Sequence, residues 1–451
     1  MRSALAVSVL ALAASVTAKQ ELWQEKYGGT PDLPFSGVAG FARLPHAVCL
    51  EEPGRGFDIA VLGMPFDLDG VHPANAQTAV SYRPGARFGP HAIRTGSRRV
   101  GPARSFLYPW GFSIGQDSEL DIVSCTTCPS ADLQIDCNDV PVSPYDNALA
   151  IDEMQVAYQT LINRPTTSKK TKYTSGLAKD GEEHPRILTL GGDHTIVLPI
   201  LGALHSVYGP ISVLHFDAHL DTWNGNELGG AHTEQHKVTH GTFFWKAHEL
   251  GYINNRTSAH AGIRTRLSSF SDLLHDEAVG FQVFSTDDID DMGPEGVAAA
   301  IKRRIGDTPC YLSFDIDTID PSMAPASESH RDLFLPGTLK LTPPSSFIAG
   351  TPESGGWSTR EVKRIIRGLA GLNIVGADIV EVSPAYDTNA ELTAMAAADL
   401  ALEFLALMIA PDGPVPASKN GELNAALRAH TAAGTKGRVK LVDQTGARDE
   451  L

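Results

Sequence analysis

The chain lacks several features that mark large classes of protein. Beyond its first residues, the 451-residue sequence has no apolar run of about eighteen or more, the length that a membrane-spanning helix requires, so no membrane span is expected. The formal net charge is −16, and this shortage of positive charge disfavours binding to nucleic acid. No internal repeat is visible, so the sequence favours a globular protein over a repeat array.

Cysteine is also scarce. The five cysteines stand at positions 49, 125, 128, 137 and 310. An odd count leaves at least one thiol free in an oxidising compartment, and Cys310 is expected to be a plain buried residue. Cys125 and Cys128 lack the second pair that a zinc site needs and the context of a thioredoxin-like redox pair. A disulfide or no role is therefore favoured for them.

What is present fits one large α/β domain. With 42% hydrophobic and 20% charged residues, a single domain of about 300–350 residues is favoured over two equal halves. Strand-like and helical segments alternate, which predicts a three-layer α/β/α fold with a mostly parallel central sheet. The expected strands are residues 58–62, 187–190, 211–214, 259–263, 282–284, 311–312 and 373–377.

Three helices are predicted from caps and periodicity. Thr195–Tyr208 follows directly on His194, Ser358–Glu361 has the pattern of a capping box before a helix, and Glu391–Met408 is apolar nearly all round and therefore expected to be buried. From residue 411 onward the composition turns to Pro, Gly and Ala, which indicates a tail, residues 411–451, outside the core.

Three short clusters of Asp and His follow apolar, β-rich segments. In extended chain, residues two apart point to the same side, so the side chains of each cluster converge. Because ligand sites in open parallel sheets form outside the carboxyl ends of the strands, three strand ends can deliver six side chains to one crevice. The clusters are Gly191-Gly192-Asp193-His194-Thr195, His215-Phe216-Asp217-Ala218-His219-Leu220-Asp221 and Ser313-Phe314-Asp315-Ile316-Asp317.

The residue types predict a two-metal hydrolase centre. Four carboxylates and two imidazoles form a hard, mostly oxygen donor set that suits Mn²⁺, with Zn²⁺, Co²⁺ or Fe²⁺ as alternatives. Carboxylates this close repel one another, and a bound positive charge of about +4 keeps them ionised. A single Asp-x-His-x-Asp is often a capping or loop feature, but three clusters in order behind buried-type strands weigh against that interpretation.

The motifs resemble those of a known family. Gly-Gly-Asp-His, Asp-Ala-His-x-Asp and Ser-Phe-Asp-x-Asp are similar to the three signatures of the ureohydrolases, the arginase and agmatinase family, and residues 63–67, 83–90 and 378–387 extend the likeness. The resemblance covers roughly residues 35–410, the expected ureohydrolase domain, and is strongest toward secreted fungal agmatinase-like proteins. It implies an arginase-like fold and hydrolysis of guanidino compounds to urea with two Mn²⁺ per subunit.

The resemblance also implies roles for single residues. His194 and Asp221 would bind one manganese, His219 and Asp317 the other, and Asp217 and Asp315 would bridge both. Two metals about 3.5–4 Å apart lower the pKa of a shared water towards neutrality. Glu381 would hold the guanidinium by paired hydrogen bonds, and His240 would carry a proton to the leaving amine. A histidine before Gly in a loop is more often a surface residue, so the role of His240 rests on the resemblance.

The substrate is narrowed by the loop after Asp221. Residues 222–228 do not fit the arginase loop that holds the amino-acid end of arginine, whereas Asp221-Thr222-Trp223 and His240-Gly241-Thr242 are similar to the agmatinase and guanidinobutyrase branch. A small cationic guanidino compound, agmatine first, is the expected substrate, and guanidinobutyrate or a related guanidino acid is the alternative. A homo-oligomer, trimer or hexamer, is expected from the family.

Two other classes of protein remain as alternatives. A single-zinc deacetylase has a related fold, but both His194 and His219 beside four Asp argue for a full two-metal set. A catalytically silent binding protein retained in the endoplasmic reticulum would keep the same residues without turnover.

The two ends of the sequence predict where in the cell the protein resides. Arg2 followed by the apolar segment 4–14 and by Val16-Thr17-Ala18 is typical of a secretory signal peptide, residues 1–18, with a buried helix as the alternative. The last four residues, Arg448-Asp449-Glu450-Leu451, approximate an endoplasmic-reticulum retention signal. Residence in the lumen of the reticulum is expected, and secretion is the alternative.

One segment departs from the family pattern. Residues 327–349 separate Asp320-Pro321 from Gly350-Thr351-Pro352-Glu353, which lie much closer together in typical members. A retained intron in the gene model is the favoured interpretation of this insert. A substrate lid is the alternative, because long irregular loops beside active sites are often functional.

Overall fold

The computed structural model describes residues 36–67, 85–100, 106–107, 109–110, 112–113, 134–167, 177–227, 233–326, 353–410 and 413–414. Nearly all of these residues belong to one compact unit, Ala39–Leu451. The predicted signal peptide, Cys125 and Cys128, the insert 327–349, and the tail from residue 415 onward lie outside the described residues.

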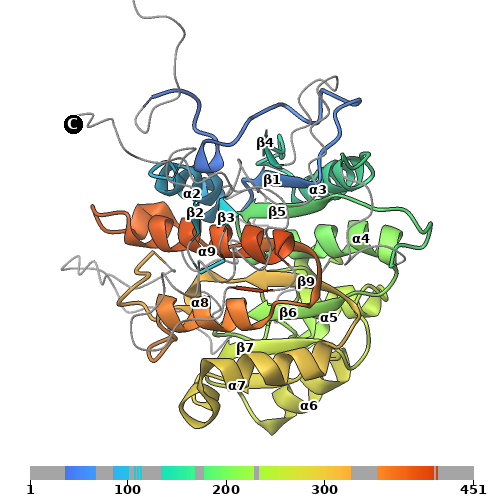
Figure 1. Ribbon diagram of the computed structural model, residues 1–451. Coiled ribbons are helices and arrows are strands. Elements are labelled where there is room, and N and C mark those ends of the chain that lie inside the picture. Colours follow the sequence, from blue (N-terminus) through green and yellow to red (C-terminus); the bar gives the residue numbers. More distant parts are fainter. Residues whose placement is uncertain are drawn as a thin grey trace, which may run out of the picture. The chain divides into compact units, whose positions relative to one another are not determined.

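Eight parallel strands form the central sheet (Figure 1). They are β1 (Ile59–Met64), β4 (Gln134–Asp139), β5 (Arg186–Gly191), β6 (Ser212–Phe216), β7 (Ala259–Ile263), β8 (Val283–Ser285), β9 (Pro309–Phe314) and β10 (Asn373–Ile379). Their order across the sheet is β4-β1-β5-β10-β9-β6-β7-β8, and every pairing is parallel. All seven predicted strands are present, and all carboxyl ends lie at one edge of the sheet.

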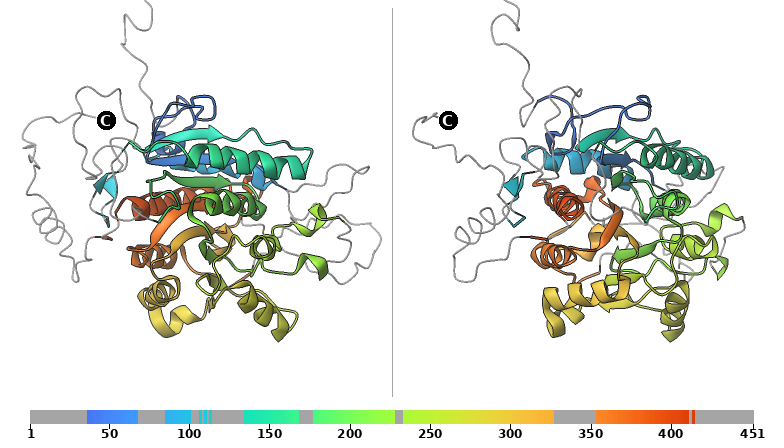
Figure 2. Two further views of the ribbon diagram at one scale, coloured as in Figure 1. Left: turned by 90° about the vertical axis from the view of Figure 1, so that its right-hand side faces the viewer. Right: turned by 45° about the vertical axis from the view of Figure 1, so that its right-hand side comes forward.

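Helices cover both faces of the sheet, which confirms the three-layer α/β/α fold (Figure 2). One core lies between the sheet and α2, α7, α8 and α9, and the other between the sheet and α3, α4 and α5. Along β5, Leu188 and Leu190 belong to the first core and Ile187 to the second, as the two-residue period of a strand requires. The helices are α2 (Gly89–Ser97), α3 (Asn147–Ile162), α4 (Val197–Tyr208), α5 (Phe243–Glu249), α6 (Phe270–Val279), α7 (Asp288–Ile305), α8 (Thr359–Gly368) and α9 (Leu392–Ile409).

The helix predictions hold in detail. Ser358 and Glu361 form the reciprocal capping box before α8. The segment after His194 begins as a 3₁₀ turn and continues as α4. By length and composition α9 is apolar enough to cross a membrane, but 78% of it is buried inside the fold, which is the setting of a core helix.

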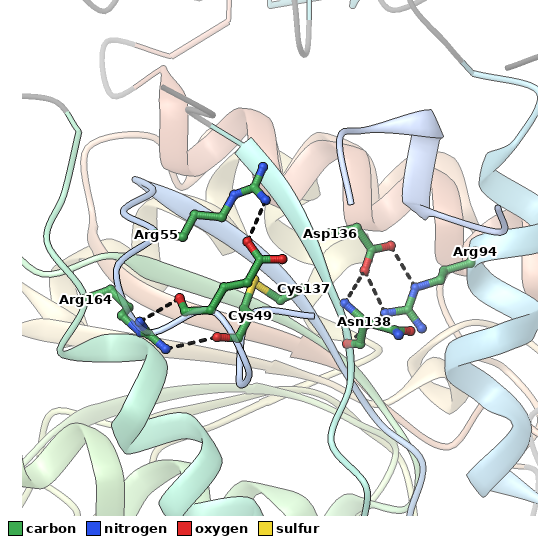
Figure 3. Close-up of a disulfide and its surroundings, with 8 residues drawn as sticks. Cys49, Arg55, Arg94, Asp136, Cys137, Asn138 and Arg164 are labelled. Atoms are coloured by element: carbon green, nitrogen blue, oxygen red, sulfur yellow. Dashed lines mark hydrogen bonds and ion pairs between the residues drawn. A yellow bond between two sulfur atoms is a disulfide. The ribbon is translucent and has the colours of Figure 1, made fainter. Parts of the chain in front are cut away.

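A disulfide joins Cys49 to Cys137 of β4 across 88 residues (Figure 3). Its surroundings are rich in charge: Arg164 donates to the backbone oxygens of Cys49 and Glu52, and Arg94 holds Asp136, the neighbour of Cys137. Cys310 is a free, buried thiol, as predicted. The sequence could not assign the Cys49–Cys137 pairing.

Candidate metal centre

Four neighbouring strands deliver the predicted site residues. In the order β5-β10-β9-β6, each strand ends in one of the motifs. His194 follows β5, Glu381 follows β10, Asp315 and Asp317 follow β9, and the loop after β6 carries Asp217, His219 and Asp221. All seven side chains are buried. Residues far apart in the sequence therefore meet at one edge of the sheet.

The first donor group surrounds His194. Its Nδ1 lies 3.2 Å from Asp217 Oδ2, 3.1 Å from Asp221 Oδ2 and 3.4 Å from Asp315 Oδ2. Among the described residues Nδ1 has no partner in hydrogen-bond geometry, and neither has Asp217 Oδ2. Buried polar atoms are rarely left without partners, so these atoms are placed for a ligand that the chain does not supply.

The second donor group surrounds His219. Its Nδ1 lies 3.2 Å from Asp217 Oδ1 and 3.0 Å from Asp317 Oδ2. Asp217 thus gives one carboxylate oxygen to each group, which is the arrangement of a bridging ligand. Asp315 is near His194, and the ligand roles of these residues remain predictions.

Backbone contacts fix the carboxylates. Asp217 Oδ1 accepts from the N–H of His219, Asp315 Oδ1 from that of Asp317, and Asp317 Oδ1 from that of Ala218. Asp221 is in the left-handed region, with φ 55°, where a non-glycine residue is strained. The backbone hydrogen bonds hold the carboxylates of Asp217, Asp315 and Asp317 in place.

Close packing explains why glycine precedes Asp193. A Cβ built on Gly192 would lie 1.7 Å from the carbonyl oxygen of Phe66, which accepts the N–H of Asp193 at 2.8 Å. No side chain fits in that space. Asp193 in turn caps the 3₁₀ turn that begins with His194, through the N–H of Thr195.

The charge balance of the site calls for cations. Burial, and then the charge of Asp217, raises the pKa of Asp221 to about 7; burial and the charges of Asp317 and Asp217 raise the pKa of Asp315 well above its ordinary value. Burial lowers the pKa of His194, but the surrounding carboxylates outweigh it and raise that pKa well above the usual range. Without cations, these raised pKa values mean that protons would have to offset the charge of the carboxylates. Divalent cations would neutralise the carboxylates without added protons, and the donor set fits two such ions.

A polar chain behind His194 orients its ring. His194 Nε2 lies 2.8 Å from Ser313 Oγ, which donates to Asp378 at 3.1 Å. Tyr311 and the N–H of Phe314 also donate to Asp378. Since Asp378 accepts from Ser313, the hydroxyl oxygen can accept from Nε2–H, which leaves the Nδ1 lone pair toward the donor group.

Glu381 and His240, the predicted catalytic residues, are both buried. Glu381 has φ 62°, its N–H donates to Gly192, and its Oε1 accepts the N–H of His194 at 2.7 Å. Neither ring nitrogen of His240 has a hydrogen-bond partner among the described residues. Burial, and then the charges of His219 and His194, lower the pKa of His240 to about 3.

Sequence reasoning missed one histidine of the cluster. His215 Nε2 lies 2.9 Å from Asp217 Oδ2, and its donor atom groups with those of His194, Asp217 and Asp221 within 4.8 Å of one another. The signal was available: His215 stands two residues before Asp217 in extended chain and so points to the same side.

Known proteins share this sequence and fold. A family model described as "Arginase family" matches residues 57–330 and 344–407. The chain is 43% identical over 380 residues to "Putative agmatinase 1" of Schizosaccharomyces pombe, covering 84% of each chain. It is 34% identical over 388 residues to an agmatinase of Chromobacterium violaceum, covering 85% of this chain and 93% of the other.

Solved structures agree. A hypothetical agmatinase from Burkholderia thailandensis matches with a TM-score of 0.60 at 31% identity, covering 85% of this chain and 94% of that one. A proclavaminate amidino hydrolase from Streptomyces clavuligerus matches with the same TM-score at 28% identity, covering 84% and 100%.

Proposed function

The chain belongs to the arginase family, and from this premise we propose that it hydrolyses agmatine to putrescine and urea at a centre of two Mn²⁺ ions. Its relatives make it a hydrolase that acts on guanidino compounds. The observation that carries the proposal is the sharing of Asp217 between two buried donor groups, because a shared carboxylate is what a two-ion site needs.

The metal ions would activate water, and the protein's own residues would bind and orient the substrate. When bound, two divalent ions supply Lewis acidity and a water that ionises near neutral pH. Glu381 is proposed to hold the planar guanidinium by paired, charge-assisted hydrogen bonds. Its left-handed backbone and its bond to the N–H of His194 fix the carboxylate beside the donor groups, so the substrate carbon is oriented before reaction.

Proton transfer is proposed for His240. As water adds to the guanidinium carbon, the bond from that carbon to the alkyl nitrogen breaks, and this nitrogen must take up a proton. Because burial keeps the pKa of His240 low, the ring does not hold a second proton at rest. It acts by passing on a proton released by the attacking water.

Manganese is proposed because of the donor types. Counted over both groups, the carboxylates of Asp217, Asp221, Asp315 and Asp317 outnumber the imidazoles of His194, His215 and His219, and no cysteine is among the described members of the cluster. Such a set favours a hard ion.

The test is urea release from purified, manganese-loaded protein with agmatine, arginine, guanidinobutyrate and guanidinopropionate. We expect agmatine to give the highest kcat/KM. A preference for guanidinobutyrate would move the assignment to a guanidino-acid ureohydrolase. Tight binding without urea from any of the four would favour the silent binding protein.

A matched variant tests the substrate anchor. Glu381→Gln keeps the shape and removes the charge, so both metals should stay bound while kcat/KM falls by the equivalent of about 2–5 kcal/mol, the cost of truncating a buried charge pair. Unchanged kcat/KM in this variant would remove Glu381 from the mechanism.

We also propose that the protein matures in the secretory pathway as a homo-oligomer. The buried Cys49–Cys137 disulfide supports the compartment, because such bonds form in oxidising surroundings. Removing the last four residues should shift the protein from cells to medium. Identical partition of both forms would favour plain secretion, and light scattering would give the number of subunits.

A further inference from the structure

An exposed turn between α5 and β7 carries the one sequence in the chain that can accept an N-linked glycan. Asn255-Arg256-Thr257 is the only Asn-x-Ser/Thr among the 451 residues. Asn255 and Arg256 are exposed, and Arg256 has φ 68°, in the left-handed region. Surface loops of this kind can carry a bulky, hydrated glycan without disturbing the core.

The backbone of this turn is fixed, whereas the side chain of Asn255 is not. The N–H of Asn254 donates to the carbonyl oxygen of Ile211 at 2.7 Å. Gly280, at the end of α6, packs against the turn: a Cβ built on it would lie 3.4 Å from the nitrogen of Arg256 and 3.7 Å from the Cα of Asn255. Among the described residues the side chain of Asn255 makes no hydrogen bond. Its amide group therefore has no structural task in this part of the fold.

The turn lies at the edge of the sheet opposite the metal centre. Ile253, just before the turn, pairs with Ile211 at the amino end of β6, whereas Asp217 follows the carboxyl end of that strand. From residue 211 to residue 217 the chain runs along β6, a distance of about 20 Å at about 3.3 Å per residue. A glycan on Asn255 would therefore begin on the far side of the sheet from the donor groups.

The hydroxyl that the acceptor sequence requires makes a contact of its own in the folded chain. Thr257 Oγ1 lies 2.6 Å from Oγ of Ser212, which is fully buried and lies 2.7 Å from Thr308 Oγ1. Because the acceptor sequence is defined in part by this hydroxyl, a transferring enzyme has to read it before β7 pairs with β6. Modification would thus precede folding of the loop, and the folded turn would then keep the glycan in solvent.

We propose that Asn255 is a site of N-linked glycosylation. The donor is an oligosaccharide joined to a lipid diphosphate in the endoplasmic reticulum. The amide nitrogen of Asn255 forms a bond to C1 of the first sugar and gives up one proton, while the bond from C1 to the diphosphate oxygen breaks and the lipid diphosphate leaves. The proposal rests on the secretory route of the proposed function, which the Cys49–Cys137 disulfide supports.

Four variants separate the acceptor from its surroundings. Asn255→Gln removes the acceptor and keeps an exposed amide. Thr257→Ala removes the required hydroxyl together with its contact to Ser212, whereas Thr257→Ser keeps both. The matched control is Asn254→Gln, because this neighbouring asparagine is outside any acceptor sequence.

The full-length chain is made in a eukaryotic secretory host and treated with a peptide N-glycosidase, which removes the glycan and leaves aspartate in place of the modified asparagine. Wild type, Thr257→Ser and Asn254→Gln should each lose the mass of one glycan, and peptide mass spectrometry should place the conversion at position 255. Asn255→Gln and Thr257→Ala should lose no mass. The kcat/KM for urea release should be the same in Asn255→Gln as in wild type.

Two outcomes would overturn the proposal. Wild type that is protected from added protease inside microsomes, yet carries no glycan, would show that the turn is not an acceptor although the chain reaches the compartment. Wild type that is not protected never meets the donor, which contradicts the secretory route and this proposal with it.

The proposed hydrolysis is tested separately. Glycosylated protein that binds two Mn²⁺ but releases no urea would contradict that activity and leave the glycan at Asn255 in place. Where Thr257→Ala fails to fold, Asn255→Gln still decides, because the side chain that it changes is exposed.

Discussion

Two regions of the molecule bury carboxylates, and they neutralise them differently. Near the β4 edge of the sheet, Arg94 meets Asp136 with Nε 2.8 Å from Oδ2 and Nη2 2.9 Å from Oδ1, and the two side chains are only 5% and 2% exposed. At the ends of β6 and β9, four buried carboxylates face imidazoles, and among the described residues none of them pairs with Lys or Arg.

The way in which a buried carboxylate is neutralised distinguishes a structural ion pair from a functional site. The ion pair near β4 needs no charge from outside the chain, because the Arg94 guanidinium neutralises the Asp136 carboxylate. The carboxylates at the centre are balanced only by shared protons or by cations from solution. A buried acidic group that the chain does not neutralise is therefore the better indicator of a site.

The largest effect is expected from Asp217→Ala, which removes an oxygen from both donor groups. Two ions without their common carboxylate repel each other, so at least one should be lost together with all measurable urea release. Metal content after gel filtration is the measurement, with Asp146→Ala, an exposed helix cap, as the control. Retention of two tightly held ions would show that Asp217 is no bridge.

Arg94→Ala should be the most destabilising change near β4. It leaves Asp136 buried without its partner, which costs about 3–5 kcal/mol of unfolding free energy, while both ions still bind. Arg364→Ala breaks an exposed pair with Glu295 and should cost no more than about 1 kcal/mol. Denaturant unfolding would compare them, and equal costs would refute the distinction between buried and exposed pairs.

Removing the disulfide tests the same contrast between the structural region near β4 and the metal centre. The double variant Cys49→Ala, Cys137→Ala should lose about 2–5 kcal/mol of stability, because the bond closes a long loop in the unfolded chain. Metal stoichiometry should not change. Reductant should shift the melting temperature of the wild type but not that of the variant; a shift in both would point to a second disulfide.

A graded effect, in place of the loss of a residue, is expected from pH. Metal ligands must lose their protons, and the pKa of Asp221 is raised to about 7, so protons compete with metal below neutrality. Affinity for Mn²⁺ should therefore rise with pH, by roughly tenfold per unit for each displaced proton below its pKa. Titrations between about pH 5 and 8 would show this slope, and a flat profile would mean that the ligands are already deprotonated.

Much of the central fold was predictable because its signals are local. Each of β5, β6 and β9 is a short apolar run with a ligand motif at its end, and Ser358 and Glu361 carry their capping box within four residues. Such patterns need no knowledge of distant parts of the chain.

Features set by distant contacts were not predictable. The edge strand β4 reads Gln-Ile-Asp-Cys-Asn-Asp, with too few β-branched residues to stand out, and the pairing of Cys49 with Cys137 cannot be deduced from spacing. The partners behind His215 belong to the same class, because His260 of β7 and Asp276 of α6 come from segments that no local pattern connects to it. The strand order, too, is not written in any one segment.

That strand order has a consequence for synthesis of the protein. The strands β9 and β10 lie between β5 and β6, although the ribosome makes them last of the eight. A nascent chain grows at about 5–20 residues per second, so β5 and β6 emerge several seconds before the strands that separate them. Metal delivered earlier meets only part of the donor set. The complete donor set for metal therefore exists only after β9 and β10 have entered the sheet. Metal is expected to bind in the compartment where that step takes place.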